Sequence, residues 1–337
     1  MDDKLQKKAA SLFIPFLLLG LFSKANGQEA NSLLNRCWPS SNLAEKIGEK
    51  KFIYHNHTFD APPSSKDNFL SAQIIPQNYR GPIRRVHLHS EKKLLALTFD
   101  LCELSGEIAG YDAALIQFLR EQQIKATLFA GGKWMRSHSE RTHQLMVDPL
   151  FEIANHSETH RNLRLLKNKA LTDQILDPEY TYDALRSALK FNQCIRENDP
   201  MLEQVSEKMS LFRFPFGACN EESIKAVNNA GYFIIQWDVS TGDPSKKQSA
   251  KAIAETILKA KPGSIIIGHA NGHGYNTAEG LKIALPELRK RGFDFVTVSE
   301  LLKEGVPEIS QSCYDRRIGD TDKYDTFFSN REKKSLN

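Results

Sequence analysis

From Leu94 onward, apolar runs of strand length alternate with stretches of helical periodicity, and the alternation continues to about Leu302. The sequence predicts strands at residues 94–100, 126–130, 151–155, 211–214, 232–238, 264–268 and 293–298. Helices are expected between them, at residues 110–123, 139–148, 171–190, 221–230, 250–261 and 277–290. This repeated strand–helix order indicates a parallel sheet with helical crossovers and both faces covered. It fits either an open doubly wound sheet or a closed, irregular barrel, and periodicity does not choose between them.

The two flanks of this alternating region have a different character. Residues 28–90 are polar and interrupted by several prolines, which predicts an extended N-terminal extension that leads into the core. Residues 307–337 are again polar, and we expect them to form a frayed tail. The central domain is therefore expected to span residues 91–306.

The first 27 residues predict a secretory signal. Lys4, Lys7 and Lys8 precede an apolar run that ends at Phe22, and small residues follow up to Gly27. The run is shorter than the about 20 apolar residues that a membrane-spanning helix needs. We therefore expect cleavage after Gly27 and a secreted or periplasmic chain with no transmembrane anchor in its mature form.

Composition and charge add two limits. The chain of 337 residues is 40% hydrophobic and 26% charged, which suits a folded domain with a substantial core. Its 45 Lys and Arg exceed its 41 Asp and Glu by only 4 charges. So small a surplus predicts no surface that follows a phosphate backbone, and nucleic acid is not an expected partner.

Export changes the interpretation of the 5 cysteines, because disulfides persist in an oxidising compartment. Their number is odd and no two have the short spacing of a zinc knuckle, so at least one is expected to stay free or to take another role. Cys37 and Cys313 lie outside the regular core at opposite ends, and we hypothesise that they link the two flanks.

Chemically useful side chains follow several predicted strands, at the edge where functional groups gather in α/β folds. The first strand ends at Asp100, and Glu103 follows shortly after. The third strand is followed by His156 and His160, whose spacing places both imidazoles on one face of a helical segment. Paired imidazoles of this kind commonly bind a single metal ion.

The later strands add an arginine and a histidine. Arg213 opens the motif Arg-Phe-Pro-Phe-Gly, where a guanidinium can hold a carboxylate ionised and the turn can present backbone N–H groups to an anion. The next strand ends at Trp237 and Asp238, and the sixth is followed by His269, which suits a general acid or base. Each signal alone has an ordinary structural explanation, so their ordered recurrence carries the interpretation.

The ordered set Thr-Phe-Asp, His-Ser-x-x-His, Arg-x-Pro-Phe-Gly and Ile-Gly-His resembles the polysaccharide deacetylase family, also called the NodB homology domain or carbohydrate esterase family 4. The resemblance covers about Leu94 to Leu302 and implies an irregular (β/α) barrel. It also implies a metal-dependent hydrolase that removes N-acetyl groups from a polysaccharide. We expect peptidoglycan as the first candidate substrate and a chitin-like oligosaccharide as the second. Zn²⁺ is the first candidate ion, and Co²⁺ or a similar dication the second.

For the catalytic machinery, the resemblance implies roles for residues of this sequence. Asp100 would be the base that activates the water held by the metal, and Arg213 would orient its carboxylate. His269 would be the acid that protonates the leaving amine. His156 and His160 would bind the metal.

The resemblance also implies contacts to the substrate by Phe216, Trp237 and Asp238. The backbone N–H of Phe216 would help to hold the tetrahedral oxyanion. Trp237 would line the pocket for the acetyl methyl group, although an ordinary place in the core explains this residue nearly as well.

The first departure from the family is at Leu101, where a second Asp usually completes the protein ligands of the metal. Leucine cannot bind a metal, so Glu103, the thiolate of Cys102 or water is expected in its place. An alternative for Cys102 is a disulfide with Cys219, because both follow a strand at the same end of the expected barrel.

The second departure concerns the partner of His269. The Asp that the family usually pairs with the acid histidine is missing from its expected offset, where Ser240 stands. Asp238 would face the same side of a strand as Ser240 and could take over this contact, and Asp243 is the alternative.

Two other functions stay open. The missing Asp favours a degenerate, non-catalytic glycan-binding barrel, whereas the presence of Asp100, Arg213 and His269 together favours an enzyme, because binding alone needs neither an acid nor a base. The other function is that of an amidohydrolase acting on a small non-sugar amide. Export and the long segment between His160 and Arg213 disfavour it.

Overall fold

The computed structural model describes residues 32–64, 73–196 and 199–327 of the chain. The expected secretory signal, residues 1–27, and the last part of the predicted tail, residues 328–337, lie outside the described residues. Within the described ranges, no helix is long and apolar enough to cross a membrane.

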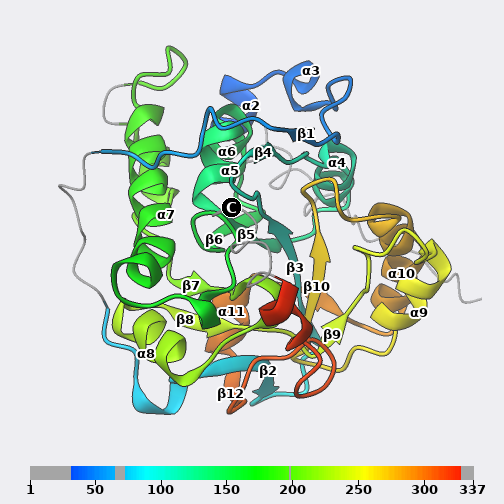
Figure 1. Cartoon of the computed structure of the whole chain (residues 1–337). Helices are drawn as coiled ribbons and strands as arrows, with labels where there is room; N and C mark the ends of the chain where they lie inside the picture. The colour runs from blue at the N-terminus through cyan, green and yellow to red at the C-terminus, as the bar shows by residue number, and fades with distance from the viewer. Residues whose placement is uncertain (1–31, 65–72, 197–198, 328–337) are drawn as a thin grey trace, which may run out of the picture.

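One large sheet forms the body of the protein (Figure 1). Its strands are β2 (Pro82–Leu88), β3 (Leu94–Leu101), β5 (Ala126–Ala130), β6 (Phe151–Asn155), β7 (Leu211–Phe212), β8 (Phe233–Ile235), β9 (Val239–Ser240), β10 (Ile265–His269), β11 (Asp294–Phe295) and β12 (Gly305–Ile309). Their order is β12-β2-β8-β7-β6-β5-β3-β10-β9, and β11 pairs with β3. The strand pairs from β2 to β9 are parallel, as the alternating pattern predicts, whereas β12 runs antiparallel to β2.

Two short strands bring the ends of the sheet together. β8 pairs with β7 and β2, whereas β9 pairs with β10 at the other end of the strand order. Only Gln236, Trp237 and Asp238 separate β8 from β9. An antiparallel bridge between Arg85 of β2 and Ser264, just before β10, joins the same two ends. The sheet is therefore strongly curled, and the expected irregular barrel is confirmed.

The side chains of β3 alternate between two apolar clusters. The odd-numbered residues from Leu95 to Leu101 belong to the cluster that lies between the sheet and the surrounding helices. The even-numbered Leu94 and Ala96 belong to a smaller cluster inside the curl. Because side chains on a strand alternate with a period of 2, Asp100 is on the inner face at the carboxyl end of β3.

Helices cover the outside of the curled sheet. They are α4 (Ala113–Glu121), α5 (Gly132–Ser137), α6 (Ser139–Met146), α7 (Asn168–Leu189), α8 (Glu221–Asn229), α9 (Ala250–Ile257), α10 (Thr277–Lys290) and α11 (Val298–Lys303). Figure 1 shows α7 and α8 on one flank and α9 and α10 on the other. Val298 and Leu301 of α11 instead join the inner cluster.

Two predicted strands are shorter than expected. The stretch 232–238 is a strand only over β8, because the chain leaves one end of the sheet there to reach the other as β9. The stretch 293–298 is a strand only over β11. Thr297 ends it by capping α11, since its hydroxyl accepts from the N–H of Glu300 while the Glu300 carboxylate accepts from the N–H of Thr297.

Both flanks contribute strands to the sheet, which the sequence did not predict. β2 comes from the N-terminal extension, β12 crosses the predicted boundary between the central domain and the tail, and their prolines are compatible with strands. Pro82 is the first residue of β2, and Pro307 lies in the edge strand β12, where a missing N–H is tolerated. The expected frayed tail is wrong for the described residues up to 327, which pack against the barrel.

The first part of the N-terminal extension folds over one end of the molecule, at the top of Figure 1. It contains α2 (Leu33–Cys37), α3 (Ser40–Leu43) and β1 (Ile53–Tyr54). β1 forms a small antiparallel pair with β4 (Glu107–Ile108), which follows the first strand of the predicted core.

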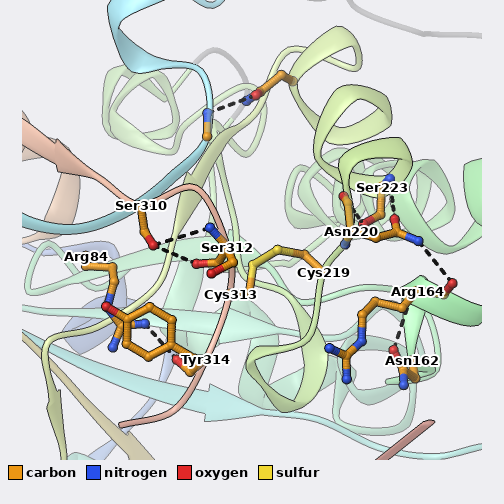
Figure 2. Close-up of a disulfide and its surroundings, with 12 residues drawn as sticks. Arg84, Asn162, Arg164, Cys219, Asn220, Ser223, Ser310, Ser312, Cys313 and Tyr314 are labelled. Atoms are coloured by element: carbon orange, nitrogen blue, oxygen red, sulfur yellow. Dashed lines mark hydrogen bonds between the residues drawn. A yellow bond between two sulfur atoms is a disulfide. The ribbon is translucent and has the colours of Figure 1, made fainter. Parts of the chain in front are cut away.

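The disulfides differ from both expected pairings. Cys37 bonds to Cys194, which ties α2 to the segment after α7. Cys313 bonds to Cys219, which ties the C-terminal segment to the loop after β7 (Figure 2). The predicted pairs Cys37–Cys313 and Cys102–Cys219 are therefore wrong, because each flank lies beside a different part of the barrel. Cys102 is buried and forms no disulfide.

Candidate active site

A buried ion pair lies at the base of the site. Nη1 of Arg213 donates a hydrogen bond to Oδ1 of Asp100 at 2.8 Å. The Arg213 side chain is fully buried, and its guanidinium carbon lies 3.9 Å from the centre of the Phe129 ring. The sequence predicts this pair, which joins the end of β3 to the residue after β7.

The charges around Asp100 keep its carboxylate ionised. Burial alone would raise the pKa of Asp100, but the positive charges that face it, those of His156 when protonated, Arg213 and His269, hold it below its ordinary value. A base of this kind is available as the anion at neutral pH.

The two predicted metal ligands come together, but not on a helix. Residues 156–160 form a loop after β6, in which Ser157 and His160 have positive φ values of 66° and 50°. The turn brings the ring centroids of His156 and His160 to 4.9 Å from each other. The helical geometry expected from the spacing is therefore wrong, although it led to the right pair of neighbours.

The orientation of the His156 ring is fixed from behind. Nδ1 of His156 donates to the backbone oxygen of Arg213 at 2.9 Å, so Nε2 carries the free lone pair. Nε2 is buried, lies 3.3 Å from Oδ2 of Asp100, and has no hydrogen-bond partner among the described residues. Burial lowers the pKa of both His156 and His160, which favours the neutral form that binds metals.

The residues around these imidazoles fit a divalent metal. Sγ of Cys102 and a ring nitrogen of each of His156 and His160 lie within 4.8 Å of one another. Burial, followed by the charge of Asp100, raises the pKa of the Cys102 thiol well above its ordinary value.

Glu103, the other expected donor, is engaged elsewhere. Its carboxylate accepts hydrogen bonds from Nζ of Lys133 at 2.7 Å, from Oγ of Ser137 at 2.8 Å and from the N–H of Ala109 at 2.9 Å. These contacts join the loop after β3 to α5, so Glu103 has a structural role.

His269, at the end of β10, pairs with Asp243. Nδ1 of His269 lies 2.9 Å from Oδ1 of Asp243, and the His269 N–H donates to Oδ2 at 2.7 Å. Burial would lower the pKa of His269, but the charge of Asp243 raises it above its ordinary value. Asp238 is not the partner of His269, because its carboxylate accepts hydrogen bonds from Oγ of Ser264 and the N–H of Ile265.

The predicted substrate contacts line the same end of the barrel. Phe216 has a positive φ of 61°, and its ring lies 4.3 Å from that of His160. The following Gly217 is also left-handed, and a Cβ there would come within 3.0 Å of the Trp237 ring. Trp237 is 4% exposed and lies between the arginine of the ion pair and this turn, with its ring 5.4 Å from the guanidinium carbon of Arg213.

The C-terminal segment reaches the site, which no pattern in the sequence indicates. Asp315 accepts a hydrogen bond from Nε1 of Trp237 at 3.0 Å, and the Tyr324 ring lies 4.9 Å from that of Phe216. The disulfide of Cys313 and the ion pair of Arg164 with Asp325 hold this segment in place. Figure 2 shows the disulfide between the loop after β7 and the C-terminal segment.

A cavity of about 600 Å³ lies between the N-terminal extension and the loop after β10. It is lined by Lys50, Lys51, Phe52, Tyr54, Asp112 and the residues from Gly272 to Asn276. The Phe52 ring stacks on His273 with ring centroids 4.0 Å apart, so the N-terminal extension forms one wall. Aromatic residues scattered through a polar extension give no sequence signal for this contact.

A curled, mostly parallel sheet with these side chains at the carboxyl ends of its strands has the carbohydrate esterase family 4 fold. Residues 87–235 match the family model described as polysaccharide deacetylase. Over these residues the chain is therefore a relative of the polysaccharide deacetylase family. It is 28% identical over 218 residues to a peptidoglycan-N-acetylglucosamine deacetylase of Bacillus cereus, covering 64% of this chain and 90% of that protein.

Other relatives differ in what they do. A chitooligosaccharide deacetylase of Rhizobium leguminosarum is 25% identical, over 52% of this chain and 67% of the relative. A family 4 pseudoenzyme of Bacillus anthracis has a similar solved structure, with 25% identity and a TM-score of 0.51 over 67% of this chain and 70% of that one. The chain is thus a distant relative of both deacetylases and a pseudoenzyme.

Proposed function

We propose that this protein is an exported, metal-dependent deacetylase that removes N-acetyl groups from a polysaccharide. The observation that carries the proposal is that the Asp100–Arg213 ion pair, the imidazoles of His156 and His160, and the His269–Asp243 pair lie together at one end of the barrel. A protein that only bound glycans would not need this combination.

Asp100 is the proposed base. Arg213 holds its Oδ1 and keeps it ionised, which leaves Oδ2 to accept the proton of an attacking water. His156 and His160 would bind a divalent ion, for which Zn²⁺ or Co²⁺ is the first choice. Such an ion, when bound, polarises the acetyl carbonyl and lowers the pKa of water.

His269 is the proposed acid. Amide hydrolysis must deliver a proton to the departing nitrogen, and the raised pKa of His269 favours the protonated form that can supply it. Asp243 holds the ring by Nδ1, so Nε2 carries the proton that can be given to the amine.

The turn after Arg213 is the proposed substrate contact. The backbone N–H of Phe216 would stabilise the oxyanion, and Trp237 would line the pocket for the acetyl methyl group. Asp238, the third predicted substrate contact, is held by Ser264 away from His269, and we assign it no part in the reaction.

Peptidoglycan is the first candidate polymer. Relatives from Bacillus cereus and Listeria monocytogenes are peptidoglycan-N-acetylglucosamine deacetylases, and an exported protein meets the cell wall. The two disulfides support export, because disulfides persist outside the reducing cytoplasm. A chitin-like oligosaccharide is the second candidate, on the likeness to the Rhizobium enzyme.

The test is acetate release from peptidoglycan and from chitooligosaccharides by the purified chain, with and without added Zn²⁺ or Co²⁺. We expect release that depends on the dication, with more from peptidoglycan. Release from neither polymer in the presence of a bound dication would contradict the proposal.

A non-catalytic glycan-binding barrel is the second candidate, favoured by Leu101 at the usual ligand position and by the pseudoenzyme among the relatives. Measurement of the bound metal distinguishes this candidate from the enzyme. The enzyme must bind a dication at micromolar concentrations, whereas a degenerate barrel binds glycan without metal and releases no acetate.

A further inference from the structure

We propose that Cys102 binds the metal of this site as a thiolate and so replaces the missing aspartate. This inference rests on the proposed function, because it concerns the same metal. It differs from the ligand set that the family resemblance implies, since a sulfur would stand where the family has an oxygen.

The distances allow one ion among the three donors. In the tetrahedral geometry of zinc, a Zn–S bond of about 2.3 Å and Zn–N bonds of about 2.0 Å place two ligand atoms of one ion about 3.3–3.6 Å apart. Sγ of Cys102 and the nitrogens of His156 and His160 all lie within 4.8 Å of one another. A decrease of about 1.5 Å at most in each separation therefore brings the three donors onto one ion.

The alternation along β3 explains why position 102 takes over from position 101. Leu101 is fully buried in the outer cluster, so any side chain there on this strand faces the helices. Asp100 is on the inner face, and the next residue on that face is Cys102. The loop after the strand keeps Cys102 inside, where it is 8% exposed.

Hydrogen bonds with neighbouring residues fix two of the three donors, Cys102 and His156, as is usual for metal ligands. Nδ2 of Asn271 donates to Sγ of Cys102 at 3.2 Å and to its backbone oxygen at 2.9 Å. The backbone oxygen of Arg213 holds Nδ1 of His156. Partners of this kind orient metal ligands and tune their donor strength. The buried Nε2 of His156, without a hydrogen-bond partner among the described residues, points to a ligand that the site would hold.

A thiolate changes which metals the site prefers. Soft and borderline ions such as Zn²⁺, Co²⁺ and Cd²⁺ bind a set of one sulfur and two imidazoles, whereas Mg²⁺, Ca²⁺ and Mn²⁺ prefer oxygen. We expect the first group to bind tightly and the second group to be unable to displace it.

Spectroscopy can test the sulfur directly. Because the other 4 of the 5 cysteines form disulfides, any thiolate signal belongs to Cys102. The full chain loaded with Co²⁺ should show a thiolate-to-Co²⁺ charge-transfer band in the near ultraviolet. Cys102→Ser should lose the band, and Asp100→Asn, which keeps all three donors, should retain it. Cys102→Asp should bind Co²⁺ without the band, and circular dichroism checks that each variant folds.

Three results would overturn the inference, with different consequences for the proposed function. Co²⁺ bound to the native chain with visible bands but no charge-transfer band, together with acetate release, would remove Cys102 from the ligands and leave the proposed function intact. A native chain that binds neither Co²⁺ nor Zn²⁺ would overturn both. A band that persists in Cys102→Ser would also contradict the assignment.

Discussion

Asp243 holds His269 at two points, since its carboxylate lies 2.9 Å from Nδ1 of the imidazole and accepts from the His269 N–H at 2.7 Å. A third contact, from the hydroxyl of Thr277 at 2.7 Å, fixes the carboxylate itself. The sequence places Asp243 in a loop five residues past Asp238, and a strand-based argument favours the wrong one of the two. The pair therefore gives a direct test of the proposed acid.

Asp243→Asn should move the alkaline limb of the rate profile to lower pH. The negative charge of Asp243 raises the pKa of His269, so its removal lowers that pKa, and the acid form is lost at a lower pH as the pH rises. The maximal rate should also fall, by up to about 10²–10⁴-fold if the proton transfer is lost. The measurement is kcat against pH for the native chain and the variant.

Asp238→Asn is the matched control for this profile. Asp238 is bound to Ser264 and Ile265, so the substitution should leave the alkaline limb in place, whatever it does to stability. Equal profiles for the native chain and Asp243→Asn would show that His269 is not the acid.

Arg213→Met should destabilise the fold and impair the base. It leaves the Asp100 carboxylate, which is 3% exposed, without its partner, and breaking a buried ion pair costs about 3–5 kcal/mol. Without the arginine, burial should raise the pKa of Asp100, so the acid limb of the rate profile should move to higher pH. Denaturant unfolding and the pH profile measure the two effects. A variant of native stability with an unchanged acid limb would refute the assigned role of Arg213.

Glu103→Gln should lower stability without changing metal content. The carboxylate pairs with the buried Lys133, whose other carboxylate partner, Asp60, lies 3.3 Å from Nζ, so the substitution should cost less than the about 3–5 kcal/mol of a fully unpaired buried charge. Bound Zn²⁺ per chain should stay at the native level in the folded variant, whereas in Cys102→Ser it should fall. Loss of zinc from folded Glu103→Gln would make Glu103 the missing ligand instead.

The strands of the barrel and the chemistry at their ends were accessible from the sequence because both depend on local patterns. β5 and β6 follow from apolar runs between breakers, and Asp100, Arg213 and His269 follow from their places at strand ends. The pairing of Cys219 with Cys313, and the packing of Tyr324 on Phe216, depend on where the tail meets the barrel. The periodicity of a sequence does not predict contacts between segments that are far apart along the chain.

The C-terminal segment should contribute to substrate binding through its disulfide. Replacing Cys219 and Cys313 by Ser together should free the segment that carries Asp315 and Tyr324, and should raise KM more than it lowers kcat. Removal of a disulfide should also cost about 2–5 kcal/mol of stability.

The second disulfide supplies the control. Cys37 and Cys194 join α2 to the segment after α7, and their joint replacement by Ser should lower stability while leaving KM near its native value. Similar KM values in the two double variants would mean that the C-terminal segment does not contact the substrate.

The proposed function depends most directly on Asp100 as the catalytic base. The decisive measurement is the rate of acetate release from peptidoglycan by Zn²⁺-loaded native chain and by Asp100→Asn loaded to the same zinc content. We predict zinc-dependent acetate release by the native chain and a rate that is at least about 10²-fold lower in the variant. Equal rates in the two proteins, or no release by the zinc-loaded native chain, would contradict the proposed function.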